Sequence, residues 1–183
     1  MAPDVCPSWL SFTLQNRFRR KFHNPDQILS SYIKNGDIAA DIGCGPGFFT
    51  GAIARLVGDQ GRVIAADLQP AMLERTRKVL EQEGMIERAR FHRCEADRLT
   101  LPEPVDFALT FWMVHEVPDP GSFFAQIAAA LKPGGRVLFV EPKMHVMKSM
   151  FEKEIKLAER AGLDAGERPK ISLSRAVLLV KPS

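Results

Sequence analysis

A doubly wound α/β fold, in which helices cover both faces of a mostly parallel sheet, is predicted by three features of this 183-residue sequence. Short apolar runs alternate with segments of helical periodicity along most of the chain. A run of glycines follows the first apolar run, which is typical of a tight turn from a strand into a helix. Acidic residues follow the first three apolar runs, at the edge where such sheets bind ligands.

The glycine turn lies within residues 38–50. Gly43, Gly45 and Gly47 have no Cβ, so the backbone can take strained angles and a ligand can approach the main chain closely. Cys44 lies between two of these glycines, where we interpret it as a small residue that fits the turn rather than as a nucleophile.

Three acids end three successive predicted strands: Asp41, Asp67 and Asp97. Each could simply cap a helix or complete a turn. Together they are better explained by a binding site, because parallel strand ends converge at one edge of the sheet. Asp67 follows the glycine turn by about 20 residues, where a carboxylate that binds ribose hydroxyls is expected. The pattern therefore predicts a cofactor that contains adenosine.

The other elements are expected from periodicity, caps and turn residues. Asn24 and Pro25 form a helix start, and Asp119 with Pro120 forms another. The predicted helices span residues 24–33, 48–57, 70–83, 120–131 and 149–161. The predicted strands span residues 38–42, 63–67, 90–94, 105–111 and 136–141, followed by two short strands within 169–181 that meet near Ser174.

Composition indicates one globular domain over residues 1–183, with 45% apolar and 26% charged residues. The net charge of +3 does not indicate a nucleic-acid partner. Three scattered cysteines, Cys6, Cys44 and Cys94, suggest a reducing compartment. No signal peptide is recognised, and no apolar run approaches the ~20 residues that span a bilayer. We therefore expect a cytoplasmic protein without a membrane partner; the oligomeric state is not determined by the sequence.

Residues 1–23 combine aromatic side chains with a basic run, Arg17 to Lys21. This pattern favours an amphipathic helix that packs on the core of residues 24–183. A lid over the active site is the second interpretation, and a surface for RNA is the third.

Several motifs resemble those of the class I S-adenosylmethionine-dependent methyltransferases, in particular the small-molecule type similar to the methyltransferases of ubiquinone and menaquinone biosynthesis. The resemblance is carried by Asp41 to Gly47, Asp67, Glu95 to Asp97, Asp106 to Glu116 and Leu131 to Gly135. It implies a Rossmann-like sheet of seven strands, mostly parallel with one antiparallel strand, in the order 3-2-1-4-5-7-6. It also implies S-adenosylmethionine as cofactor and S-adenosylhomocysteine as product.

The resemblance assigns roles to individual residues. Asp41 would meet the methionyl ammonium, Asp67 the ribose diol, and Asp97 with the Ala96 amide the adenine. The predicted cofactor-binding residues are Asp41, Gly43, Cys44, Gly45, Gly47, Asp67, Leu68, Met72, Ala96, Asp97 and Phe111. The predicted acceptor pocket consists of Trp112, Met113 and His115. No metal site is expected, because the histidines lack zinc-like spacing.

His115 and Glu116 follow the fourth predicted strand and are the candidate catalytic residues. A histidine there could deprotonate an acceptor near neutral pH. Alternatively, Glu116 caps or forms a salt bridge and His115 packs against the cofactor, because positioning alone can supply most of the acceleration of methyl transfer.

The leading hypothesis is therefore methyl transfer by SN2 displacement to a small, partly apolar acceptor. Three alternatives remain open: a nicotinamide-dependent oxidoreductase, a protein that binds the cofactor without turnover, and an RNA methyltransferase. The glycine spacing argues against the first, because it is not the Gly-x-Gly-x-x-Gly of dinucleotide sites.

Overall fold

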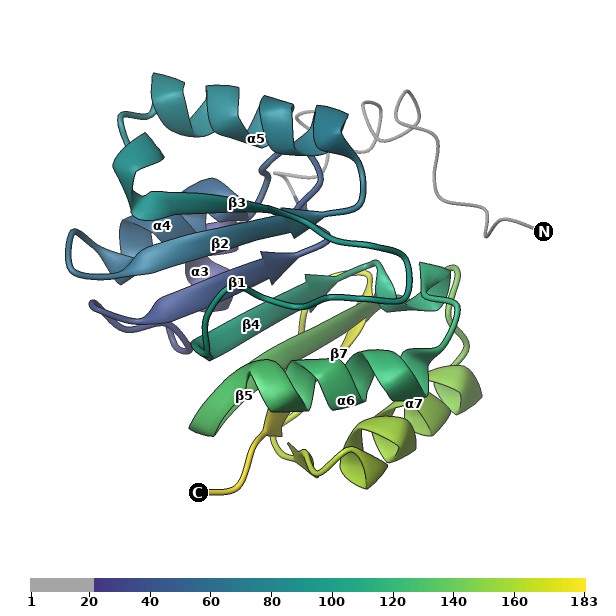
Figure 1. Ribbon diagram of the computed structural model, residues 1–183. Helices are drawn as coiled ribbons and strands as arrows, with labels where there is room; N and C mark the ends of the chain where they lie inside the picture. The colour runs from purple at the N-terminus through teal and green to yellow at the C-terminus, as the bar shows by residue number, and fades with distance from the viewer. Residues whose placement is uncertain (1–21) are drawn as a thin grey trace.

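A seven-stranded sheet forms the centre of the computed structural model, which describes residues 22–183 (Figure 1). The strand order is β3-β2-β1-β4-β5-β7-β6. Strand β7 is antiparallel to both of its neighbours, and all other pairs are parallel. The strands are β1 (Ile38–Ile42), β2 (Arg62–Asp67), β3 (Ala89–Arg93), β4 (Val105–Phe111), β5 (Leu131–Pro142), β6 (Asp164–Ala165) and β7 (Ser174–Val180). The predicted fold class and strand order are confirmed.

Helices cover both faces of this sheet (Figure 1). They are α3 (Pro25–Leu29), α4 (Thr50–Val57), α5 (Pro70–Gln82), α6 (Pro120–Ala130) and α7 (Lys148–Arg160), with 3-10 turns η1 (Ile86–Arg88) and η2 (Val114–Glu116). The two predicted caps are present: the side chain of Asn24 accepts the Gln27 N–H, and that of Asp119 accepts the Ser122 N–H. Each cap satisfies a backbone donor that the first helical turn leaves unpaired.

The core consists of two apolar layers, one on each side of the sheet. Ala40, Ile42 and Phe139 belong to the layer beneath α6 and α7, whereas Ala39 and Leu138 belong to the layer beneath α3 and α4. Neighbouring residues of one strand therefore point into different layers, as the pleat requires. Burial on both faces explains why these strands read as continuous apolar runs.

Two predicted boundaries differ from the structure. The regular part of the first helix ends at Leu29 rather than near residue 33, because Tyr32 N–H bonds to the Leu29 carbonyl three residues back. Strand β5 begins at Leu131 rather than at Arg136, because Leu131 already pairs with Val105 before a register shift.

Of the two predicted strands that meet near Ser174, the second is present as β7, but the first is wrong. Residues 169–173 form no strand; the outer neighbour of β7 is the two-residue β6 at Asp164–Ala165. Pro169 has no N–H to donate to a ladder. Leu173 has a φ of 57°, which turns the chain just before β7 begins.

The sequence prediction for residues 1–23, a packing helix or a lid, falls outside the described residues except for Phe22 and His23, and so does Cys6. Within residues 22–183, no helix combines the length and the apolar character that crossing a bilayer requires.

The order of the sheet determines where a ligand can bind. The chain leaves β1 toward β2 on one side, and later elements extend from β4 on the other side of β1. Ile42, at the end of β1, pairs with Ala66 of β2 and with Thr110 of β4. The segments that follow these three strands therefore start side by side, at the switch point where doubly wound sheets bind ligands.

Candidate active site

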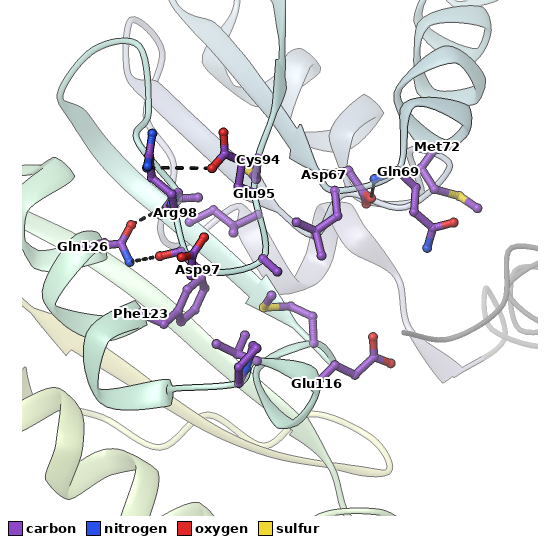
Figure 2. A pocket seen from close by; sticks show the side chains of 18 of the residues that line it. Asp67, Gln69, Met72, Cys94, Glu95, Asp97, Arg98, Glu116, Phe123 and Gln126 are labelled. Atoms are coloured by element: carbon purple, nitrogen blue, oxygen red, sulfur yellow. Dashed lines mark hydrogen bonds and ion pairs between the residues drawn. The ribbon is translucent and has the colours of Figure 1, made fainter. Parts of the chain in front are cut away.

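A cavity of about 350 Å³ lies at the carboxyl ends of β1 to β4 (Figure 2). Its walls come from the segments after these four strands and from the first half of α6. Residues on the described chain that line it include Gly43, Gly45, Asp67, Leu68, Gln69, Met72, Ala96, Asp97, Leu99, Phe111, Trp112, Met113, Glu116, Ser122, Phe123 and Gln126.

Of the fifteen site residues predicted from the sequence, eleven line this cavity, and four, Asp41, Cys44, Gly47 and His115, do not.

Asp67 joins the end of β2 to the glycine turn. One carboxylate oxygen accepts the Gly45 N–H at 2.9 Å and the other accepts the Gln69 N–H at 2.9 Å. Gly43, Gly45 and Gly47 all have positive φ, so the expected strained turn is present. Burial raises the pKa of Asp67, although these N–H donors act against the rise. The carboxylate is therefore held in one orientation at the cavity wall.

Three of the predicted residues that do not line the cavity instead stabilise the glycine turn. Asp41 is 3% exposed and accepts the Thr50 hydroxyl at 2.6 Å. Burial raises the pKa of the Cys44 thiol well above its ordinary value, which disfavours the reactive thiolate. A Cβ on Gly47 would lie 3.2 Å from the Thr76 backbone, so glycine allows α5 to pack closely against the turn.

Gln126 of α6 fixes the segment that carries Asp97. Its side-chain amide donates to the Asp97 carbonyl at 2.9 Å and accepts the Leu99 N–H at 2.7 Å (Figure 2). The sequence pattern did not predict a role for Gln126. The available signal was its spacing of four from Ser122, which puts the two on one helix face.

The remaining wall is apolar and follows β4. Trp112 has a φ of 61°, and its indole N–H donates to the Ser174 hydroxyl at 2.9 Å. Met113 packs on the glycine turn, since a Cβ on Gly43 would lie 3.0 Å from the Met113 Cγ. Phe111 and Phe123 are both buried and line the same cavity. This end suits a partly apolar molecule.

His115 lies behind this wall, against Glu141. Its Nδ1 is 2.5 Å from Glu141 Oε2, and its Nε2 is 4.0 Å from Glu116 Oε1. The hydrogen bond to Glu141 raises the pKa of His115. Glu141 was predicted only as the last residue of a strand. Its signal was the one used for Asp41 and Asp67, an acid at the end of an apolar run.

Glu154 of α7 adds a second buried carboxyl to this region. It is 3% exposed, and within residues 22–183 neither of its oxygens has a hydrogen-bond partner. Burial, with the nearby charge of Glu141, raises its pKa from 4.5 to about 7. Glu154 therefore holds its proton at mildly acidic pH.

We expect Glu154→Gln to flatten the pH dependence of stability. Below pH 4.5 both the folded and unfolded states hold this proton, whereas between 4.5 and about 7 the unfolded chain releases it first. The free energy of unfolding therefore falls as pH rises through this window, by on the order of 3 kcal/mol. In urea unfolding from pH 4.5 to 8, the free energy of unfolding of the variant should rise relative to that of the wild type toward pH 8. Glu159→Gln, an exposed change on the same helix, is the control; parallel curves for all three proteins would contradict the expectation.

No group of three or more His, Cys, Asp or Glu side chains in the described part of the chain could hold a metal ion.

Comparison with known proteins gives one family match. The sequence profile of a family described as a methyltransferase domain matches residues 39–135. That range contains the glycine turn, Asp67, Asp97 and the segment after β4.

Curated relatives cover part of the same range. The ubiquinone/menaquinone biosynthesis C-methyltransferase UbiE of Marinomonas sp. (strain MWYL1) is 30% identical over 130 residues, which is 69% of this chain and 52% of the relative. UbiE of Teredinibacter turnerae (strain ATCC 39867 / T7901) is 34% identical over 112 residues, 61% of this chain and 45% of the relative. The chain spans about half the length of these relatives.

A solved structure shares the fold. The crystal structure of a SAM-dependent methyltransferase from Aquifex aeolicus aligns with a TM-score of 0.84 over 96% of this chain and 99% of that one. The two are 20% identical, so this likeness concerns the fold.

Proposed function

Because this chain belongs to the methyltransferase domain family, we propose that it transfers a methyl group from S-adenosylmethionine to a small, partly apolar acceptor. The proposal takes residues 24–183 as one catalytic domain. The observation that carries it is Asp67, whose carboxylate lines the cavity while it anchors the glycine turn.

The cavity has features that fit the cofactor. Its volume of about 350 Å³ falls in the range of small-molecule sites. Asp67 supplies acceptor oxygens for a ribose diol, and Asp97 supplies one for an adenine amine. Leu68 and Met72 offer apolar surface to a purine between these two acids.

The residues of the chain would act mainly by positioning. When bound, S-adenosylmethionine supplies an electrophilic methyl group on a positively charged sulfur. Phe111, Trp112 and Met113 form a wall that excludes water and orients the acceptor. Alignment of two reactants in this way lowers the barrier without a strong base. Glu116 lines the same end and can accept a hydrogen bond from the acceptor.

The acceptor class follows from this lining. An apolar body fits the aromatic wall, and an O–H or N–H group fits Glu116. The relatives are named as C-methyltransferases of ubiquinone and menaquinone biosynthesis, so hydroquinones are the first acceptors to test.

The alternatives have less support. Nothing in the family match favours nicotinamide chemistry. The RNA hypothesis depends on Arg17 to Lys21, which lie outside the described residues. A protein that binds the cofactor without turnover has the same cavity, and only a turnover assay separates it from an enzyme.

Calorimetric titration tests the proposal. We expect S-adenosylhomocysteine to bind with micromolar affinity and NAD and NADP to show no measurable binding. Preference for NAD, or no binding of S-adenosylhomocysteine, would contradict the proposed cofactor.

A further inference from the structure

We propose that Glu141 is a positioning residue that acts through His115 on Glu116, so that Glu116, rather than His115, is the group presented to the acceptor. This inference rests on the proposed function, which identifies one end of the cavity as the acceptor end. The contacts among Glu141, His115 and Glu116 do not depend on the cofactor. It reverses the roles expected from the sequence, in which His115 faced the acceptor.

Glu141 holds the backbone of η2 in place. It is fully buried at the end of β5. Its Oε1 accepts the Val114 N–H at 2.8 Å and lies 3.4 Å from the His115 nitrogen, whose N–H also points to it. A buried carboxylate needs hydrogen-bond donors, and here the donors are backbone N–H groups of the first two residues of η2. These bonds therefore fix where η2 begins.

The ring of His115 extends this arrangement toward the cavity. Its Nδ1 meets the second oxygen of Glu141, and its Nε2 faces Glu116 at 4.0 Å. Side-chain exposure rises through this series of three residues, from 0% for Glu141 to 22% for His115 and 33% for Glu116. The three groups therefore lead from the interior to the cavity wall, with Glu116 at the open end.

The charges of Glu141, His115 and Glu116 are complementary. A protonated His115 donates from Nδ1 to Glu141, and its positive charge lies within 4.0 Å of Glu116 Oε1. A cation beside Glu116 favours its ionised form. An ionised Glu116 can accept the proton that the acceptor loses, while the electron pair of that O–H or N–H bond stays on the acceptor.

Other titratable groups also face His115. Glu154 of α7 lies close enough to contribute to its electrostatics. The ring of His145, after β5, stacks on that of His115 with centroids 6.1 Å apart. Both Glu154 and His145 are therefore close enough to affect the titration of His115.

Nuclear magnetic resonance of the His115 imidazole tests the inference without an acceptor. The ring nitrogens are followed against pH in the wild type and in Glu141→Gln, Glu116→Gln and Glu159→Gln. Glutamine at position 141 can still accept the backbone N–H bonds, so the turn is retained while the charge is lost. We expect Glu141→Gln to weaken proton binding at His115 tenfold or more, Glu116→Gln to weaken it at least twofold, and Glu159→Gln to leave it unchanged.

Two results would overturn the inference. If Glu141→Gln leaves the His115 titration in place, Glu141 serves only as a backbone acceptor. If Glu116→Gln leaves the His115 titration in place, the electrostatic link from Glu141 through His115 does not reach Glu116 at the cavity. Titration with S-adenosylhomocysteine separates this inference from the proposed function: absence of binding by the wild type contradicts the cofactor assignment, whereas the His115 titrations still decide the roles of Glu141 and Glu116.

Discussion

Asp67→Ala should weaken S-adenosylhomocysteine binding by about 5- to 150-fold, which corresponds to about 1–3 kcal/mol. The substitution removes the carboxylate that we propose accepts hydrogen bonds from the ribose hydroxyls. It also removes the partner of the Gly45 N–H and of the Gln69 N–H, so the cavity wall loses its anchor. Calorimetry with the purified variant measures the change.

The matched control is Asp59→Ala, which removes an acid whose side chain is 81% exposed and pairs with Arg88 away from the cavity. Its affinity should equal that of the wild type. Thermal unfolding of both variants without ligand shows whether the loss of binding follows from a loss of fold. An unchanged affinity in a folded Asp67→Ala protein would refute the assignment of the ribose site.

Gly61→Ala should lower the free energy of unfolding by about 3 kcal/mol, because overpacking against rigid backbone is costly. A Cβ at this position would lie 2.5 Å from the Asp37 carbonyl oxygen and 2.6 Å from the Val57 carbonyl oxygen. Neither oxygen belongs to a flexible side chain, so the start of β2 would have to move. Urea unfolding monitored by circular dichroism measures the effect.

Gly121→Ala provides the comparison for this prediction. The nearest atoms to a Cβ there are the Asp119 carboxylate oxygen at 3.3 Å and a Leu157 methyl carbon at 3.7 Å, both at the ends of side chains. Within the first turn of α6, alanine also has the higher helix propensity. We expect a change within about 0.5 kcal/mol. Equal effects at the two positions would contradict the steric argument.

Much of the fold could be predicted because local signals agreed with one another. Asn24 and Asp119 cap the helices that they were expected to cap, and the strand order follows the family resemblance. Of the last two strands, β7 was predicted but β6 was not. Strand β6 is only two residues long, too short to leave a periodic pattern.

The candidate site was predictable where it depends on the ends of strands. Asp67 and the glycine turn fall into this class, since one edge of the sheet collects them. Glu141 carries the same strand-end signal, but its partners could not be predicted, because they depend on the register of β5 against β4. The role of Gln126 depends on the face that α6 presents. The position of His115 depends on the short η2 turn, whose geometry no local pattern specifies.

The cavity wall has a further consequence for how specificity can change. The proposed cofactor side is assembled from three separate segments, after β1, β2 and β3, whereas most of the proposed acceptor side comes from one continuous segment, Phe111 to Phe123. A change of acceptor therefore requires replacement of a single stretch of sequence. Evolution, or a designer, can exchange that stretch between relatives while the nucleoside site is inherited intact.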